Sequence, residues 1–369
     1  MGIQQIEIQL IAAVVAVACA LPGVFLVLRK MAMLSDAISH AILFGIALAF
    51  FVVEDLGSPL LIVGAALTGV LTVYLVETLQ KTRLVREDTA IGLVFPVLFS
   101  IGVILISHYA GNVHLDIDAV LLGELAFAPF NRLVFYGYDI GPKSLYVMGG
   151  ILLINIAFII LFYKELKLAA FDTELAAAIG FSPTIIHYGL MTQVSLTTVG
   201  AFDAVGAILV VALIIAPPAT AYLLTDRLSR MLVYSALIGI ASAISGFWLA
   251  HWQDVNIAGS MATMCGVIFA IVYLIAPERG MLALAKRRIN QRWDFAQRML
   301  AVHLLHHLGQ PEEVRECRLN TLHEHLKWDK KFAQKVAKMA KREGLVQENN
   351  GLLKLTESGK SLAEQAMTV

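Results

Sequence analysis

The segment 33–53 reads MLSDAISHAILFGIALAFFVV, which is apolar and long enough to cross a bilayer as a helix of about 20 residues. Asp36 and His40 interrupt it near its start. Because they are four residues apart, a helix places the carboxylate and the imidazole on one face. A charged side chain at the centre of a span costs about 2.5–3.5 kcal/mol, and these two groups are ligands for divalent transition metals. The segment therefore predicts a membrane helix that carries a metal-binding pair.

The composition of the whole chain is that of a membrane protein. Of 369 residues, 58% are hydrophobic and only 15% are charged, which excludes an ordinary soluble domain. Apolar stretches separated by short polar loops continue to about Ala276, and from Glu278 onward charged residues and histidines are clustered. Cys19, Cys265 and Cys317 stand singly, so the sequence offers neither a disulfide framework nor a zinc knuckle.

We expect an all-α polytopic membrane protein with about nine transmembrane helices, the first of them retained because no Lys or Arg precedes its long apolar run. The predicted spans are residues 8–28, 33–53, 59–79, 89–108, 145–163, 185–199, 204–224, 232–252 and 258–276. The sixth span is short, and Gly200 and Asp203 interrupt the predicted hairpin 185–224. This interruption is compatible with a discontinuous helix of the kind that builds transporter sites.

The loop charges predict the orientation of the spans. Lys and Arg concentrate in alternate loops, which are residues 29–30, 81–86, 164–167, 227–230 and 279–288. The other loops, at 54–55, 112–118 and 253–256, are acidic or neutral. Because positive loops stay inside, we expect an external amino terminus and a cytoplasmic carboxyl terminus in a bacterial inner or plasma membrane.

Two loops carry further candidate functional residues. The outer loop 108–142 contains Asp116, Asp118 and Glu124, which predict an acidic vestibule that attracts cations, either around a re-entrant or interfacial helix or in a solvated loop.

The inner loop 167–180 predicts a short helix, with Asp172 as its N-cap, Glu174 in its first turn and Gly180 as its stop. This helix either lies on the membrane or, together with Phe171, couples the protein to an ATPase partner.

Five stretches of the chain carry a family resemblance. They are MLSDAISHA at 33–41, REDTAIG at 86–92, KELK at 164–167 followed by Phe171 and Asp172, AVGAILVVAL at 204–213, and PPATA at 217–221. Spread in this order over about 280 residues, they make the chain resemble the integral-membrane subunit of the ABC-3 family of manganese, zinc and iron importers. Relatives often have proline where this chain has Phe44, so a helix kink there is not expected.

The resemblance implies a type II importer-like fold and several partners. These are an ABC ATPase subunit, an extracytoplasmic metal-binding protein and a second permease copy, which is identical or different. A separate ATPase agrees with the sequence, since Ser358-Gly359-Lys360-Ser361 lacks the earlier glycine of a Walker A loop and has Lys354 instead. No permanently bound cofactor is expected, only the transported ion.

The candidate metal path consists of Asp36, His40, Asp203 and Glu87. Oxygen ligands with a single histidine favour Mn²⁺ or Fe²⁺, although Zn²⁺ competes at any such site. Each residue also has an ordinary structural interpretation: Asp203 and Glu87 could cap helices, and His40 could pack against a backbone carbonyl. The rival functions are a secondary metal carrier and a membrane-tethered metal-responsive regulator.

Residues 290–369 predict a small cytoplasmic α+β domain. Helices are expected at 292–308, 319–326, 330–342 and 357–366, with a hairpin that turns at Asn350-Gly351. This order is similar to a winged helix, and residues 341–346 and 355–359 resemble iron-dependent repressors. The basic helix 330–342 would suit DNA, but we expect a regulatory or assembly module and no nucleic-acid partner. His303 and His307, four apart, could sense cytoplasmic metal.

Overall fold

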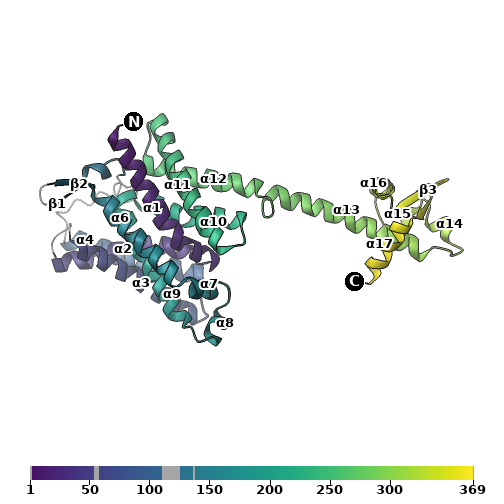
Figure 1. Ribbon diagram of the computed structural model, residues 1–369. Helices are drawn as coiled ribbons and strands as arrows, with labels where there is room; N and C mark the ends of the chain where they lie inside the picture. Colours follow the sequence, from purple (N-terminus) through teal and green to yellow (C-terminus); the bar gives the residue numbers. More distant parts are fainter. Residues whose placement is uncertain (1, 54–57, 110–124, 136–137, 369) are drawn as a thin grey trace. The chain divides into compact units, whose positions relative to one another are not determined.

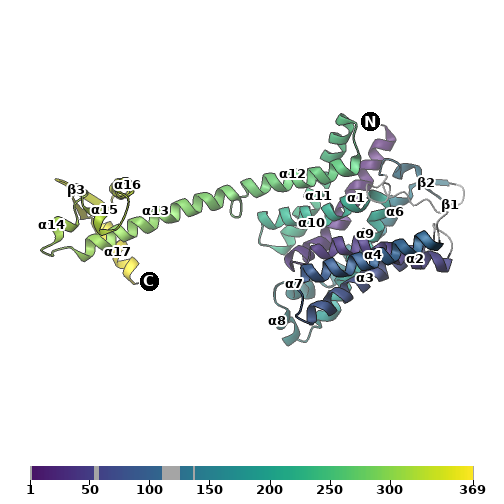
Figure 2. The same ribbon diagram turned by 180° about the vertical axis from the view of Figure 1, so that it is seen from behind.

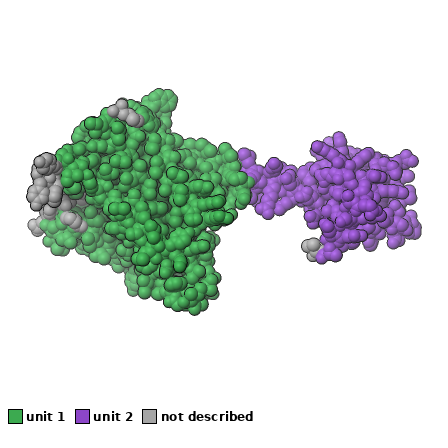
Figure 3. Space-filling view, in the orientation of Figure 1, with its two compact units in different colours: residues 1–280 green, residues 281–369 purple. Residues whose placement is uncertain are grey.

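The computed structural model describes residues 2–53, 58–109, 125–135 and 138–368 (Figure 1). The chain divides into two compact units, Met1–Gly280 and Met281–Val369, which are coloured separately in Figure 3. The second unit begins at Met281, before the predicted start at 290, because one helix runs without a break from Met281 to His306.

Unit 1 is a helical bundle. Its helices are α1 (Ile3–Leu28), α2 (Met33–Val53), α3 (Pro59–Lys81), α4 (Glu87–Tyr109), α6 (Lys143–Leu161), α7 (Tyr163–Phe171), α8 (Thr173–Ala178), α9 (Pro183–Val205), α10 (Ala207–Leu224), α11 (Leu228–Gln253) and α12 (Ile257–Ile275). Within the described residues, 8 helices are long and apolar enough to cross a membrane. The predicted polytopic helical fold is confirmed, and α9 is the helix that accounts for the difference from the nine predicted spans.

Helix α9 corrects the prediction for residues 185–224. It is a single helix of 23 residues, and Gly200 and Asp203 lie inside it. The break falls at Gly206, whose φ of 79° lies in the left-handed region that glycine tolerates. Asp203 is therefore in the last turn of α9 and does not cap α10, so its predicted position at the start of the apolar helix was wrong.

Helix α1 lies at the centre of the bundle, where it contacts α6, α9, α10 and α11. Asn155 of α6 fixes one of these crossings, because its Nδ2 donates to the carbonyl of Ala18 (3.0 Å) and to Oγ1 of Thr197 (2.8 Å). In a membrane, where apolar burial drives little association, such hydrogen bonds between helices specify the packing.

Helices α2, α3 and α4 form a second group that is seen at the front in Figure 2. Small residues allow the close contact between α2 and α3: a Cβ at Gly45 would collide with the carbonyl oxygen of Gly64 and the hydroxyl of Thr68. Gly102 of α4 also lies close to the backbone at Phe44, where a Cβ would be 2.9 Å from the amide nitrogen. Small residues let helix backbones approach in this way in membranes.

We expect Gly45→Ala to destabilise unit 1 by about 1–3 kcal/mol, because the added methyl group overpacks the α2–α3 contact. Gly92→Ala is the matched control, since it changes a helical glycine of α4 around which a Cβ meets nothing within 4 Å. The thermal unfolding midpoint of the purified protein in detergent should fall for Gly45→Ala only. Equal midpoints for the two variants would contradict the close-contact interpretation.

The outer loop contains a β-hairpin in its described part. A 3-10 turn at Ala128–Phe130 precedes β1 (Arg132–Phe135) and β2 (Tyr138–Pro142), which pair antiparallel. Arg132 forms ion pairs with Asp139 and with Glu7 of α1, the latter at 3.3 Å. In its described part the loop therefore has a 3-10 turn and a hairpin anchored to α1, and not the re-entrant or interfacial helix that was one of the two alternatives. Asp116, Asp118 and Glu124 lie outside the described residues.

Unit 2 has a core of its own. It comprises α13 (Met281–His306), α14 (Glu313–Glu316), α15 (Leu322–His325), α16 (Lys330–Arg342), β3 (Val346–Asn349), β4 (Leu352–Leu355) and α17 (Glu357–Met367). Leu300, Leu322, Val336 and Leu353 are among its buried residues. Burial also raises the pKa of the Cys317 thiol to about 11, so this cysteine behaves as a small apolar core residue.

The predicted hairpin of unit 2 is confirmed. Strands β3 and β4 pair antiparallel with Asn349 opposite Leu352. The two residues between them, Asn350 and Gly351, have φ of 52° and 80°, as a type I′ turn requires. Helix α16 begins where Asp329 accepts hydrogen bonds from the amides of Lys331 and Phe332.

Candidate functional site: a polar pair within the bundle

Asp36 and His40 form a pair on α2. Nε2 of His40 lies 3.5 Å from Oδ1 of Asp36, and each side chain is 35% exposed in the single chain. The imidazole also contacts Phe95 and Phe99 of α4, at ring-centroid distances of 5.5 and 6.4 Å. The pair is therefore packed against aromatic rings on one side and open on the other.

The pair lies at the start of α2, as its place in the sequence predicted, and this part of α2 is level with the middle of α3. A Cβ built on Gly69 would meet both Ile38 of α2 and Ser195 of α9, so these three residues share one level. Gly69 is near the middle of α3, and Ile38 lies between Asp36 and His40 along α2. Ionisable groups at this depth are costly, which makes a functional role the default interpretation.

Asp203 lies away from this pair. It follows Ser195 by eight residues on the continuous helix α9, which corresponds to about 12 Å along the axis. In the part of the chain that the structure describes, the one group of three or more clustered metal-ligand residues is elsewhere, in unit 2. Asp203 is thus separated from Asp36 and His40 within one chain.

Glu87 lies at another height in the bundle than Asp36, His40 and Asp203. It is the first residue of α4, and its Oε2 accepts a hydrogen bond from Nε2 of Gln80 (3.1 Å), which is at the end of α3. This position at a helix start stabilises the helix through its dipole. A role in stabilising the start of α4, without metal binding, therefore accounts for the position of Glu87.

The structure reveals a polar cluster that the sequence prediction missed. A carboxylate oxygen of Glu77 on α3 contacts Nε2 of His187 on α9, and Oε2 of Glu77 accepts a hydrogen bond from the hydroxyl of Tyr188 (2.8 Å). Arg29 and Lys81 line the same cavity, of about 290 Å³. More than a hundred residues separate Glu77 from His187 in the chain, so spacing could not pair them. The available signal was an acidic residue inside an apolar helix.

The loop after α7 has the local structure that its sequence predicted. Oδ1 of Asp172 accepts a hydrogen bond from the amide of Leu175 (2.9 Å) and caps α8. At the other end, the amide of Phe181 donates to the carbonyl of Ala176 (3.1 Å), and Gly180 has φ of 96°. These are the contacts of a glycine-terminated helix. The cap at Asp172 and the stop at Gly180 are both confirmed.

Apolar side chains are exposed along this same loop. Phe171 is 62% exposed, Leu175 46% and Ile179 59%. Glu174 lies beside them in the first turn of α8. Helix α8 has only 6 residues, so it is short for an independent helix and is stabilised by its two caps.

Comparison with known proteins decides the family. Residues 5–276 match the ABC 3 transport family, which is most of the chain. The chain belongs to the ABC 3 transport family. The resemblance seen in its sequence motifs is therefore confirmed.

Individual relatives of this ABC 3 protein match over nearly their whole length. The zinc transport system membrane protein TroD of Treponema pallidum is 49% identical over 98% of this chain and 99% of that protein. The manganese transport system membrane protein MntD of Bacillus subtilis is 50% identical over 76% of this chain and 95% of that protein. Among solved structures, PsaBC from Streptococcus pneumoniae in complex with Fab aligns with a TM-score of 0.63 at 29% identity, over 76% of this chain and 94% of that chain.

Membership in the ABC 3 family settles the class of function. The chain is a multi-pass membrane permease subunit of an ABC transporter, and it is not itself an enzyme. ATP is hydrolysed by a separate subunit, which sets aside the secondary carrier and the tethered regulator as primary functions.

Proposed function

We propose that this ABC 3 permease imports a divalent transition metal, with manganese as the principal ion and zinc or iron as the alternatives. The observation that carries the proposal is the Asp36–His40 pair at the start of α2, level with the middle of α3. A carboxylate with one imidazole prefers Mn²⁺ or Fe²⁺ over ions that seek thiolates, while Zn²⁺ binds such a site more tightly than Mn²⁺. The related proteins carry zinc, manganese or chelated iron in their names.

The pair supplies only part of a coordination shell, and its exposure supports a second permease copy. Each side chain is 35% exposed on the surface of the single chain, where contact with lipid would be unfavourable. A partner permease would cover this face and place its own α2 residues opposite. A weakly coordinated ion between two chains can also be released, which a transport site requires.

The other predicted path residues occupy different levels in this proposal. Asp203, about 12 Å along α9 from the level of Ser195, would contact the ion before it reaches Asp36 and His40. Glu87, at the start of α4, would lie at the opposite end of the path. The acidic residues Asp116, Asp118 and Glu124 would attract the cation to the outer vestibule.

We also propose the orientation and the remaining partners. The alternating basic loops favour an external amino terminus and a cytoplasmic carboxyl terminus. An extracytoplasmic metal-binding protein would deliver the ion on the acidic side. The exposed apolar side chains around α8, with Asp172 and Glu174, would dock onto the ATPase subunit on the basic side.

Uptake of radioactive manganese by the assembled transporter tests the proposal. Cells that lack other manganese importers would express this chain with its ATPase and binding protein, and unlabelled Zn²⁺ or Fe²⁺ would be added as competitors. We expect ATP-dependent accumulation of manganese and co-purification of the ATPase with the chain. If a complex that hydrolyses ATP accumulates none of the three metals, the proposal is refuted.

Unit 2 is proposed to modulate transport without being required for it. Its core is its own, and every proposed path and coupling residue lies in unit 1. We expect a chain truncated after Arg288 to import metal normally at low metal concentration and to be less inhibited at high concentration. Uptake by matched amounts of the full and truncated chains in the membrane measures this. A truncated chain that still binds its ATPase but does not transport would show that unit 2 belongs to the translocation machinery.

A further inference from the structure

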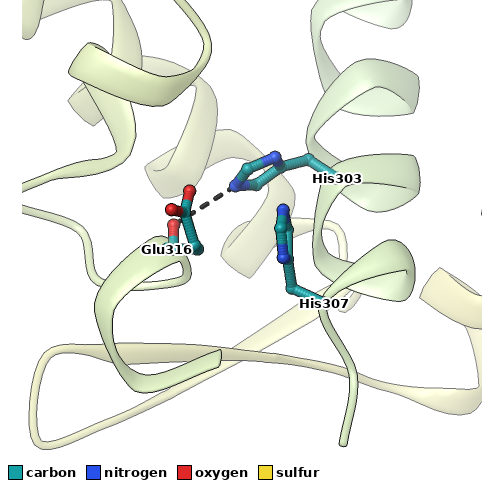
Figure 4. A group of neighbouring side chains, drawn as sticks. All are labelled: His303, His307 and Glu316. Atoms are coloured by element: carbon teal, nitrogen blue, oxygen red, sulfur yellow. Dashed lines mark hydrogen bonds between the residues drawn. The ribbon is translucent and has the colours of Figure 1, made fainter. Parts of the chain in front are cut away.

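Three potential ligand side chains meet in unit 2. His303 lies in the last turn of α13, His307 directly follows that helix, and Glu316 is the last residue of α14 (Figure 4). One nitrogen from each imidazole and one carboxylate oxygen all lie within 4.8 Å of one another. The three side chains point toward one another, and all three are partly buried. The fold therefore brings potential ligands from the end of α13 and from α14 close together, although they are separated in the sequence.

From this geometry we infer that His303, His307 and Glu316 bind a divalent transition metal ion, a site distinct from the proposed transport path. Two imidazoles and one carboxylate are a ligand set that proteins use for Zn²⁺, with water in the fourth position. Zinc bonds of about 2.0–2.1 Å place tetrahedral ligands roughly 3.4 Å apart. Side-chain rotation that closes the group by a little over 1 Å would complete the site.

Surrounding contacts already orient two of the ligands. Nε2 of His303 donates a hydrogen bond to the carbonyl of Glu316 (3.2 Å), which leaves the lone pair of Nδ1 available. Nδ1 of His325 lies 2.6 Å from Oε2 of Glu316, which leaves the other carboxylate oxygen to bind the ion. Metal sites commonly hold their ligands through outer contacts of this kind. His325 is thus a positioning residue.

Cobalt binding to the full-length chain in detergent tests the inference, because Co²⁺ in such a site absorbs visible light through its d–d transitions. All variants would be made in a chain that already carries Asp36→Ala and His40→Ala, so that binding in the proposed transport path does not contribute. The result is then independent of the proposed function, since a chain that transports nothing could still bind Co²⁺ in unit 2.

Glu316→Gln and His307→Ala should each abolish the Co²⁺ absorption or weaken binding at least about 100-fold, while His325→Ala should weaken it about 10–100-fold without changing the stoichiometry. His306→Ala is the matched control, since this neighbouring histidine is exposed and lies outside the group. Unchanged absorption in Glu316→Gln, or an equal loss in His306→Ala, would overturn the inference, the latter by showing that surface imidazoles bind the ion.

Hydrogen exchange of the parent chain gives a second test that does not depend on how the ligand variants fold. Zn²⁺ would connect the end of α13 to α14 and, through His325, to α15. We therefore expect slower amide exchange across residues 303–325 when Zn²⁺ is added, with little change in the β3–β4 hairpin. An identical exchange pattern with and without Zn²⁺ would contradict the site.

Discussion

Replacing Asp36 or His40 with Ala is expected to reduce metal uptake about 100-fold or more while the protein still inserts and binds its ATPase. Losing even an outer contact of a metal site costs about 10–100-fold, and these residues are proposed to be ligands. They lie at the start of α2, level with Gly69 in the middle of α3, where ionisable groups are costly. Uptake of radioactive manganese at low concentration is the measurement.

Ser39→Ala is the control for this prediction. Ser39 lies between the two ligands on α2, but its hydroxyl donates to the carbonyl of Ser35 (2.9 Å) within the same helix. Its removal should leave uptake almost unchanged. Near-normal uptake by both Asp36→Ala and His40→Ala would remove the pair from the path. Asp203→Ala should also reduce uptake, but less, because it lies about 12 Å along α9 from the level of Ser195.

Replacing Asp172 with Lys is expected to prevent coupling to the ATPase subunit, so that both its association and metal uptake are lost. The change removes the cap that binds the amide of Leu175, which costs about 0.5–2 kcal/mol, and it puts a positive charge at the helix amino terminus. A helix of 6 residues is marginally stable, so losing its cap would unfold it. Its exposed apolar side chains would then no longer form one surface. Glu174→Pro should act in the same direction, because a residue before proline avoids the helical conformation that Thr173 adopts.

Association with the ATPase and uptake would be measured together for these variants. Ser182→Ala provides the control, since Ser182 precedes α9 at a cap position but its side chain makes no capping hydrogen bond. We expect the control to bind the ATPase and transport normally, and Asp172→Lys to lose both. Unchanged association and uptake in Asp172→Lys would mean that α8 rests on the membrane and does not couple the subunits.

Features that depend on neighbouring residues in the chain could be predicted from the sequence. The apolar segments predicted the membrane helices, because crossing hydrocarbon requires about 20 apolar residues whatever the tertiary fold. The cap at Asp172, the stop at Gly180 and the Asn350-Gly351 turn were predicted for the same reason: each is decided by hydrogen bonds and φ angles within a few residues.

Helix α9 shows why local patterns fail inside the bundle. Its polar residues and two interruptions suggested a short span and a break, yet it is helical to Val205. Tertiary contacts compensate for its polarity: the hydroxyl of Ser195 donates to the carbonyl of Ala66 (2.8 Å), and Thr197 accepts from Asn155. A polar group satisfied by another helix no longer opposes burial, and hydropathy along one segment does not contain that information.

The sequence by itself determined that this is a membrane permease with a separate polar unit, and it identified the helical pair of Asp36 and His40. Only the tertiary structure decided the level of that pair against α3, the place of Asp203 in the last turn of α9, the contact of Glu77 with His187, and the approach of Glu316 to His303 and His307. The physical reason is the separation along the chain between the residues that interact. Helical periodicity fixes which residues share a face within a turn or two, whereas the packing of whole helices decides which distant faces meet.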